Sequence, residues 1–208
     1  TAPAFANALR VLLAVGGCAS TRPPDSPEVV RARSELVVTA LNFVDVDYKW
    51  GGNSADEGFD CSGFTRHVYQ TVGGIALPRS AEQQAAAPGF RKVALHELAP
   101  GDLVFFDNTC GLSGEGLVND PLTHVGIVER VESNGTIVFI SRVAGAIERY
   151  RMNVAHPHIH RTADGRLLND YMRRKHWRDG EQTPYLTGEL FAAFGTRVVE
   201  SASSPDRR

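Results

Sequence analysis

A cysteine at the start of a predicted helix carries the clearest chemistry in this chain. Cys61 lies in the sequence FDCSGF at residues 59–64, and Phe64, Val68 and Val72 follow at the four-residue spacing of one buried helix face. The backbone N–H groups and the dipole of a helix N-terminus favour a thiolate over a thiol. The pattern therefore predicts that Cys61 is a nucleophile for covalent catalysis.

A nucleophilic cysteine needs a base, and the best candidate is a histidine that opens an apolar run. His124 begins the sequence HVGIV at residues 124–128, which is typical of a buried strand. A strand end holds an imidazole rigidly against a helix that packs on the sheet, so the two residues can meet although they are distant in sequence. We expect Cys61 and His124 to form a catalytic pair.

Five sequence blocks surround this pair in a fixed order. They are YKWGG at 48–52, DCSGF at 60–64, LPRS at 77–80, PGDLVFF at 100–106 and HVGIV at 124–128. Through them, the chain from about residue 28 to residue 153 resembles the NlpC family of papain-like cysteine peptidases. The resemblance implies a papain-like α+β fold. It also implies hydrolysis of the stem peptides of bacterial peptidoglycan, at a D-glutamyl to diamino-acid bond.

The resemblance also implies roles for residues around the pair. The phenol of Tyr48 would donate a hydrogen bond to the oxyanion, beside the backbone N–H of Cys61. Asp60 and Ser62 would line the pocket for the D-glutamyl side of the substrate, where a carboxylate can hold an amine. Arg79 would bind a substrate carboxylate, with an ordinary salt bridge at a helix entry as the alternative.

The third catalytic residue is where the sequence departs from the family, which usually has His, Asn or Gln on the next strand. Here Ser141 stands in that place. If Asn134 and Gly135 form a two-residue turn, Ser141 faces the same side as His124. A hydroxyl can accept the imidazole N–H but orients it less firmly than an amide would. Three alternating histidines are the other candidates for the third group, or for a metal site: His156, His158 and His160.

The order of the predicted elements indicates an α+β fold with N-terminal helices packed on a central antiparallel sheet. A helix begins at Pro27, capped by Asp25 or Ser26, and Ser80 with Gln83 forms a capping box for a short helix. The first helix is expected to bury Val30, Val37, Leu41 and Val44. The expected strands cover 103–107, 124–132, 136–143 and 146–152. The glycine-rich connection 108–121, which contains Cys110, is expected to form one wall of the substrate cleft.

The N-terminal segment resembles a bacterial lipoprotein signal. A short apolar stretch and the small residues GG precede Cys18, which would become the lipidated residue. The proline-rich sequence that follows is typical of an extended tether. We therefore divide the chain into a signal segment 1–18, a tether 19–27, a catalytic domain 28–178 and a C-terminal extension 179–208, part of it disordered.

Composition limits the partners. The net charge is −2 over 208 residues, so nucleic acid is not expected as a partner. No cofactor or metal is predicted, because no carboxylate accompanies the three histidines at ligand spacing. The expected partners are peptidoglycan stem peptides and a membrane reached through the lipid anchor. The chain is expected to be a monomer in the cell envelope, on the outer membrane facing the periplasm. The alternative functions are a wall amidase or acyltransferase with the same Cys/His pair, and a wall-binding module.

Overall fold

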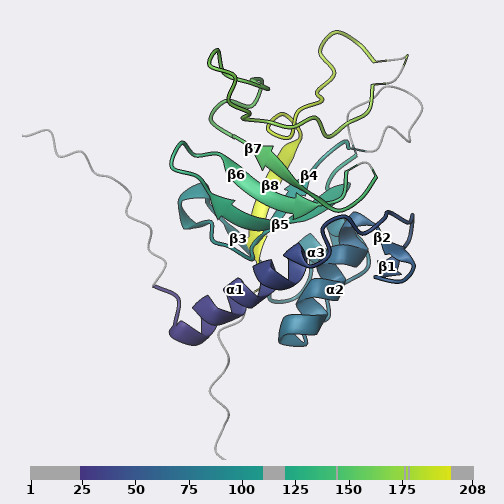
Figure 1. Cartoon of the computed structure of the whole chain (residues 1–208), viewed down its shortest axis with the longest axis vertical. Coiled ribbons are helices and arrows are strands. Elements are labelled where there is room, and N and C mark those ends of the chain that lie inside the picture. The colour runs from purple at the N-terminus through teal and green to yellow at the C-terminus, as the bar shows by residue number, and fades with distance from the viewer. Residues whose placement is uncertain (1–23, 110–119, 144, 176, 178, 198–208) are drawn as a thin grey trace, which may run out of the picture.

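The structure is a computed structural model that describes residues 24–109, 120–143, 145–175, 177 and 179–197. Helices come first and the large sheet follows (Figure 1). The helices are α1 (Pro27–Leu41), α2 (Cys61–Gly73), α3 (Ala81–Ala85) and the 3-10 turn η1 (Leu95–Glu97). The strands are β1 (Asn53–Ser54), β2 (Gly58–Phe59), β3 (Arg91–Val93), β4 (Leu103–Phe106), β5 (His124–Val131), β6 (Ile137–Ser141), β7 (Glu148–Met152) and β8 (Phe191–Thr196). The predicted residues Cys18 and Cys110 lie outside the described residues.

The described strands β3 to β8 form one antiparallel sheet in the order β3-β8-β4-β5-β6-β7, and β1 pairs with β2 in a separate ribbon. The prediction of an α+β fold is confirmed. The sequence-based strands agree with β4 to β7 to within a few residues, but β3 and β8 were not predicted. β8 lies inside the sheet between β3 and β4, so the expected domain boundary at residue 178 falls short of a strand that the sheet requires.

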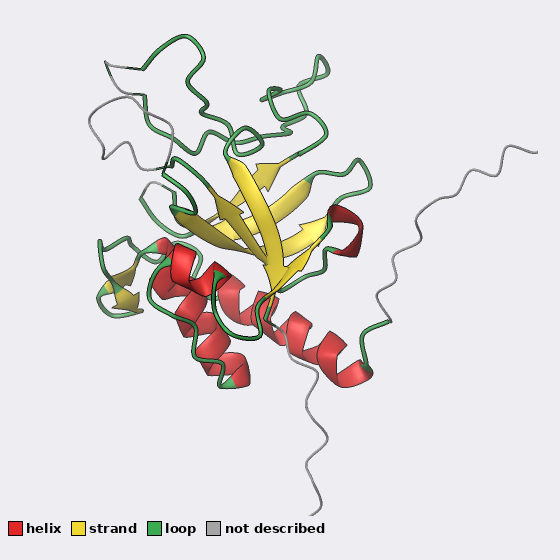
Figure 2. Ribbon diagram, turned by 180° about the vertical axis from the view of Figure 1, so that it is seen from behind, coloured by secondary structure: helices red, strands yellow, loops and turns green. Residues whose placement is uncertain are grey.

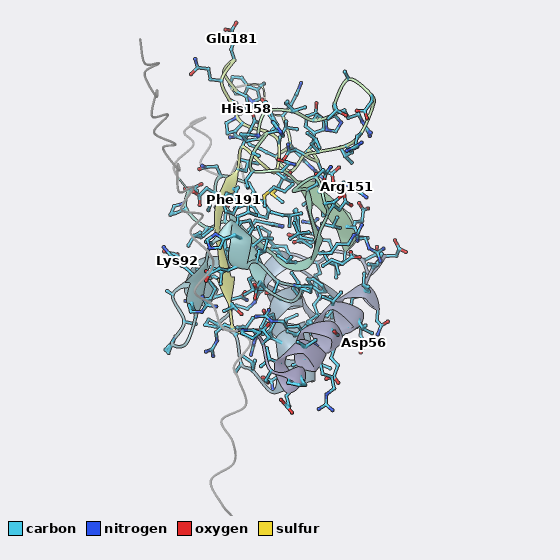
Figure 3. The ribbon with its side chains drawn as sticks, turned by 90° about the vertical axis from the view of Figure 1, so that its left-hand side faces the viewer. Asp56, Lys92, Arg151, His158, Glu181 and Phe191 are labelled. Carbon is cyan, nitrogen blue, oxygen red and sulfur yellow. The ribbon has the colours of Figure 1, made fainter. Side chains whose placement is uncertain are left out.

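Both faces of the sheet are covered. On one face, α1 and α2 pack over a core that includes Phe64, Phe105 and Ile127. On the other, the long connection 153–190 between β7 and β8 covers a second core through Met172 and Leu190. Figures 1 and 2 show the helices on one side of the sheet and this connection on the other. In Figure 3, His158 and Glu181 of the connection lie at the opposite end of the molecule from Asp56, which lies between β1 and β2. The sheet is therefore held between helices and an irregular layer.

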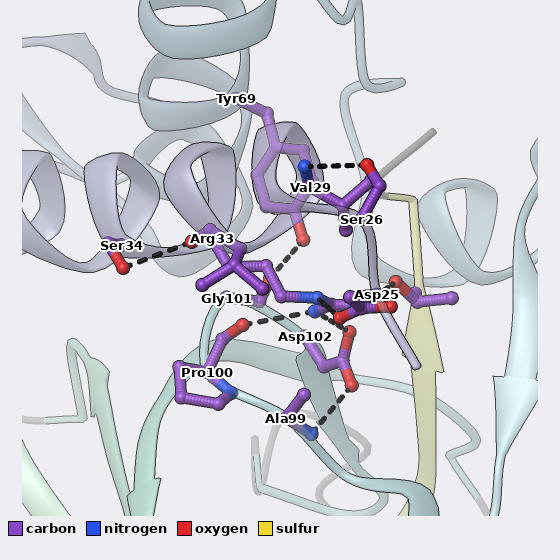
Figure 4. A network of polar contacts seen from close by, with 12 residues as sticks. Asp25, Ser26, Val29, Arg33, Ser34, Tyr69, Ala99, Pro100, Gly101 and Asp102 are labelled. Atoms are coloured by element: carbon purple, nitrogen blue, oxygen red, sulfur yellow. Dashed lines mark hydrogen bonds and ion pairs between the residues drawn. The ribbon is translucent and has the colours of Figure 1, made fainter. Parts of the chain in front are cut away.

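The buried face of α1 differs in part from the predicted one, although the predicted Leu41 and Val44 do pack against the core. Its buried residues are Val29, Arg33, Leu36 and Ala40, whereas Val30 is 52% exposed. Arg33 lies on the buried face of α1. Its guanidinium donates to Asp25 (2.6 Å) and to the fully buried Asp102 (2.7 Å) (Figure 4). A buried carboxylate must be paired with a cation. The pairing of Asp102 with Arg33 therefore sets which side of α1 is buried, rather than the spacing of its valines.

Side-chain hydrogen bonds cap α3 and attach α2 to the segment before β4. Ser80 and Gln83 form the predicted capping box at the start of α3, which is confirmed. The side chain of Tyr69 in α2 donates a hydrogen bond to the carbonyl of Gly101, which precedes β4 (Figure 4). Among the described residues, no helix combines the length and the apolar character that crossing a membrane needs.

Candidate active site

Cys61 is the first residue of α2, and the residue before it caps the helix. Asp60 Oδ1 accepts a hydrogen bond from the backbone N–H of Gly63 at 2.7 Å, and the Asp60 carbonyl accepts from Phe64 at 2.9 Å. The partly buried thiol of Cys61 therefore lies at the positive end of a helix dipole, next to backbone N–H groups without helical partners.

Glycines bring the segment of Tyr48 onto this helix end. A Cβ atom at Gly63 would lie 2.1 Å from the carbonyl oxygen of Gly52, so neither backbone leaves room for a side chain. The contact is closed by a hydrogen bond from Asp60 N–H to the same Gly52 carbonyl (3.2 Å). Tyr48 bonds the strand before the helix through a bridge to Phe59. The YKWGG and DCSGF blocks therefore pack as one unit.

His124 begins β5, and Ser141 at the end of β6 fixes the orientation of its ring. Its Nε2 lies 2.8 Å from the hydroxyl oxygen of Ser141, which is fully buried. The Ser141 hydroxyl donates its single hydrogen to the carbonyl of Val125 at 2.7 Å. Ser141 can therefore only accept from His124, so the neutral imidazole carries its hydrogen on Nε2 and keeps Nδ1 as a proton acceptor.

The hairpin that places Ser141 does not have the predicted two-residue turn. Glu132 N–H donates to the Thr136 carbonyl at 2.8 Å, so residues 133–135 form the loop. Gly135 has a φ of +79°, whereas Asn134 does not have a positive φ. A two-residue turn of the Asn-Gly type needs positive φ at both positions, and here Gly135 alone supplies it in a three-residue loop.

A bulge in β5 compensates for this longer loop. The longer loop by itself would point Ser141 to the opposite face from His124, because a one-residue slip exchanges the two faces of a strand. The register shifts by one more residue between Val128 and Arg130. Together, the two shifts return Ser141 to the side of the sheet that His124 faces. They also place it one side-chain position closer to His124 than a two-residue turn would.

Burial keeps the imidazole neutral. His124 is 6% exposed, and its pKa is lowered to about 3, mainly by burial and also by the nearby Arg142 guanidinium, with Asp60 partly opposing this. Burial and a neighbouring cation both disfavour imidazolium. At neutral pH the His124 ring is therefore uncharged, and its Nδ1 carries no hydrogen and can accept a proton.

One cavity of about 410 Å³ brings most of the predicted site residues together. Its lining includes Cys61 and His124, along with Tyr48, Asp60, Ser62 and Arg79. Ser141 lies behind His124, outside the lining. The connection 108–121 contributes through its described ends, where Thr109 and Pro121 line the cavity.

Arg79 is already engaged by acceptors of the site. Its guanidinium donates to both carboxylate oxygens of Asp60, one of them at 3.0 Å, and to the Ser62 hydroxyl at 2.8 Å. This is the salt bridge that the sequence left open as the alternative reading of Arg79. The Asp60 charge is balanced in the same contact.

The three alternating histidines do not reach this site. All three lie in the connection 153–190, and none lines the cavity. His158 lies 3.0 Å from a carboxylate oxygen of Glu189, and His160 lies 2.6 Å from the Asn169 carbonyl oxygen. The alternative of a third catalytic group from this segment is therefore wrong in this structure. Among the described residues there is also no group of three potential metal ligands.

The sequence analysis missed several cavity residues, among them Arg142 and Met172. Arg142 follows Ser141 directly at the end of β6, and Met172 reaches the cavity from the connection 153–190. Adjacency to the presumed third residue was a usable signal for Arg142, because residues at a strand end next to a catalytic group often face the same cleft. No local sequence signal marks Met172, because its position in the cavity depends on how the connection 153–190 packs against the sheet.

The comparison with protein families agrees with this geometry. A model of the NlpC/P60 family matches residues 45–180, which is more than half of the chain. The chain belongs to the NlpC/P60 family. The resemblance seen in the sequence blocks is confirmed, and the matched residues contain every residue predicted for the cavity.

Curated relatives match over this NlpC/P60 region. The gamma-DL-glutamyl hydrolase of Bacillus subtilis is 46% identical over 84 residues, which is 39% of this chain and 20% of that protein. The bifunctional muramidase/DL-endopeptidase CwlT of the same species is 41% identical over 88 residues, which is 42% of this chain and 24% of that protein. The chain therefore spans about a quarter or less of the length of these relatives.

Solved structures of NlpC/P60 proteins are also similar to part of this chain. The NlpC/p60 domain of the peptidoglycan hydrolase SagA is 26% identical and covers 56% of this chain and 86% of that one, with a TM-score of 0.41. The peptidoglycan hydrolase RipB of Mycobacterium tuberculosis is 23% identical and covers 85% of this chain and 69% of that one, with a TM-score of 0.48.

Proposed function

We propose that this NlpC/P60 protein is a cysteine endopeptidase that hydrolyses peptidoglycan stem peptides at a D-glutamyl to diamino-acid bond. Cys61 is the nucleophile, His124 is the base and Ser141 orients His124. The observation that supports this most is the arrangement of Cys61 and His124 in one cavity, with the His124 tautomer set by Ser141. Two Bacillus relatives whose names refer to DL-glutamyl hydrolysis and DL-endopeptidase activity agree with this choice of bond.

The proposed reaction begins with proton transfer. His124 Nδ1 takes the proton of the Cys61 thiol as the sulfur attacks the carbonyl carbon of the scissile amide. The negative charge that forms on the carbonyl oxygen is met by the Tyr48 hydroxyl and the Cys61 backbone N–H. His124 then gives its proton to the leaving amine, which leaves a thioester on Cys61.

Water completes the cycle. His124, neutral again, takes a proton from a water molecule that attacks the thioester carbonyl. The C–S bond breaks, the proton on His124 goes to the sulfur of Cys61, and the glutamyl product leaves as the carboxylic acid, which loses its proton to solvent. Ser141 contributes by holding the imidazole in one tautomer throughout, since its hydrogen remains on the Val125 carbonyl.

Identification of the products tests the function. The purified protein is incubated with wall fragments, and the new termini are identified by mass spectrometry. A new amine on the diamino acid is the expected result. A new amine from a muramoyl linkage would make the protein an amidase instead, and retention on the wall without cleavage would make it a binding module.

Thiol labelling tests the nucleophile in the same preparation. Iodoacetamide is expected to modify Cys61 faster than Cys110, and Cys61→Ala is expected to abolish cleavage. The control is His156→Ala, which removes a histidine that does not line the cavity and is expected to keep the wild-type rate. Equal labelling of the cysteines, together with cleavage by Cys61→Ala, would contradict the proposed mechanism.

We also propose that Cys18 is lipidated and that the protein faces the periplasm from the outer membrane. The support is sequence alone: an apolar stretch and two glycines before Cys18, with a proline-rich tether after it. A tether of this kind would let the catalytic domain reach the wall from a membrane anchor. We propose in addition that the protein is a monomer.

A further inference from the structure

Arg142 is a cation in the wall of the cavity whose role the proposed reaction does not explain. It follows Ser141 at the end of β6 and is partly buried. Its guanidinium carbon lies 2.9 Å from the centre of the Tyr48 ring, and both residues line the cavity with Cys61. The guanidinium therefore lies over the face of the Tyr48 ring in a cation–π contact.

No acid of the described chain neutralises Arg142. Where the structure places residues, no carboxylate lies within ion-pair distance of it, and its buried Nε has no hydrogen-bond acceptor. Arg79, the other arginine of the cavity, donates to both oxygens of Asp60. The cavity thus contains one arginine that is paired with a carboxylate and one whose buried Nε has no acceptor.

The surroundings of Arg142 leave it charged but partly desolvated. Burial lowers its pKa, the nearby Tyr48, Cys61 and Tyr150 oppose this, and Arg174 adds a smaller lowering. An arginine stays charged at neutral pH. Partly buried cations in folded proteins are normally paired with an anion, because desolvation is costly without one. An anionic group that enters the cavity would supply the missing partner.

We propose that Arg142 binds a free carboxylate of the substrate next to the scissile bond and thereby determines specificity. This inference rests on the proposed function. A glutamyl residue joined through its side chain keeps its α-carboxylate, and a diamino acid of the diaminopimelate type carries a further carboxylate. Either one can accept two parallel hydrogen bonds from a guanidinium. The role assigned earlier to Arg79 is thereby given to Arg142.

A substrate series identifies the carboxylate. Three synthetic stem peptides are compared: one with both carboxylates, one with the glutamyl α-carboxylate converted to an amide, and one with lysine in place of the diaminopimelate-type residue. The wild type is expected to lose about 10- to 100-fold in kcat/KM on one of the two altered peptides. Arg142→Met is expected to lose the same factor on the full peptide and no further activity on that altered peptide.

Two variants control for charge and fold. Arg142→Lys keeps the charge and is expected to recover part of the discrimination. Arg149→Met removes an exposed arginine of β7 that pairs with Glu129 (2.8 Å), and it is expected to keep the full discrimination of the wild type. An equal loss on all three peptides in Arg142→Met would show that Arg142 acts only through Tyr48 or the fold, and would overturn the inference.

Binding separates this inference from the proposed function. The same three peptides are titrated onto Cys61→Ala protein, with and without Arg142→Met. Carboxylate-dependent binding that Arg142→Met removes would support the inference even if the wild type hydrolyses none of the peptides, a result that would overturn only the function. Hydrolysis in which neither altered peptide is discriminated would keep the function and overturn the inference.

Discussion

The Ser141 hydroxyl accepts from His124 Nε2 at 2.8 Å because its own hydrogen is committed to the Val125 carbonyl at 2.7 Å. A serine hydroxyl can rotate to donate or to accept, so without a second partner it would not select one tautomer of the imidazole. The second hydrogen bond removes that freedom. A residue that looks weak in the sequence is thereby turned into an oriented acceptor.

Replacement of Ser141 by alanine is expected to lower kcat by about 10- to 100-fold. The substitution leaves the Nε2 hydrogen of His124 and the Val125 carbonyl without partners, and a buried polar group left unpaired costs about 1–3 kcal/mol. Steady-state hydrolysis of a synthetic stem peptide measures the effect. His158→Ala, in an exposed side chain paired with Glu189, serves as the matched control and is expected to keep the wild-type kcat. An unchanged kcat in Ser141→Ala would show that His124 is oriented by other contacts.

The buried His124 is expected to make the protein less stable in acid. Its pKa is about 3 in the folded protein, below the ordinary value of 6.5, mainly because of burial. Above pH 6.5 the ring is neutral in both states and contributes nothing. As pH falls from 6.5 toward 3, the unfolded chain takes up a proton that the folded one does not, so stability is lost by up to about 1.4 kcal/mol per pH unit.

Urea unfolding across this pH range tests the effect of His124. His124→Gln is expected to show a shallower loss of stability between pH 6.5 and 4 than the wild type. The exposed His96, replaced by glutamine, controls for the loss of any histidine and is expected to keep the wild-type slope. Parallel curves for the wild type and His124→Gln would mean that the folded ring takes up its proton as readily as the unfolded one.

Gly63→Ala is expected to destabilise the protein by about 1–3 kcal/mol, the usual cost of overpacking. The new Cβ would lie 2.1 Å from the Gly52 carbonyl oxygen, which must move away and carry the Tyr48 segment with it. Thermal unfolding gives the stability, and peptide hydrolysis is expected to fall as well. Gly180→Ala is the control, since a Cβ there meets no atom within 4 Å. Wild-type stability in Gly63→Ala would show that the segment adapts freely.

Membrane association is expected to depend on Cys18. When the gene is expressed in a bacterial host with a start codon in place, the protein should partition with membranes, and Cys18→Ser should release it, because a thiol is needed for the lipid. Cell fractionation and mass spectrometry of the N-terminus measure the two properties. Membrane partition of Cys18→Ser equal to that of the wild type would exclude lipidation at this residue.

The sequence by itself determined the two residues that we propose to react, and the class of fold. Cys61 and His124 could be found because each stands at the boundary of an element whose signal is local: a helix with four-residue spacing, and a β-branched run. The glycines at 52 and 63 could be recognised as a pattern for the same reason. Hydrophobic periodicity and turn residues act over a few positions, and such signals are readable in one chain.

Only the tertiary structure decided which residues meet. The buried face of α1 depended on Arg33 pairing with Asp102, which lies 69 residues away along the chain. A longer loop and a bulge in β5 each shift the register by one residue, and together they place Ser141 one side-chain position closer to His124 than the predicted turn would. Arg142 lines the cavity and lies over the ring of Tyr48, and its Nε has no acceptor. Pairings of this kind depend on the summed packing and charge of distant segments, which no local pattern encodes.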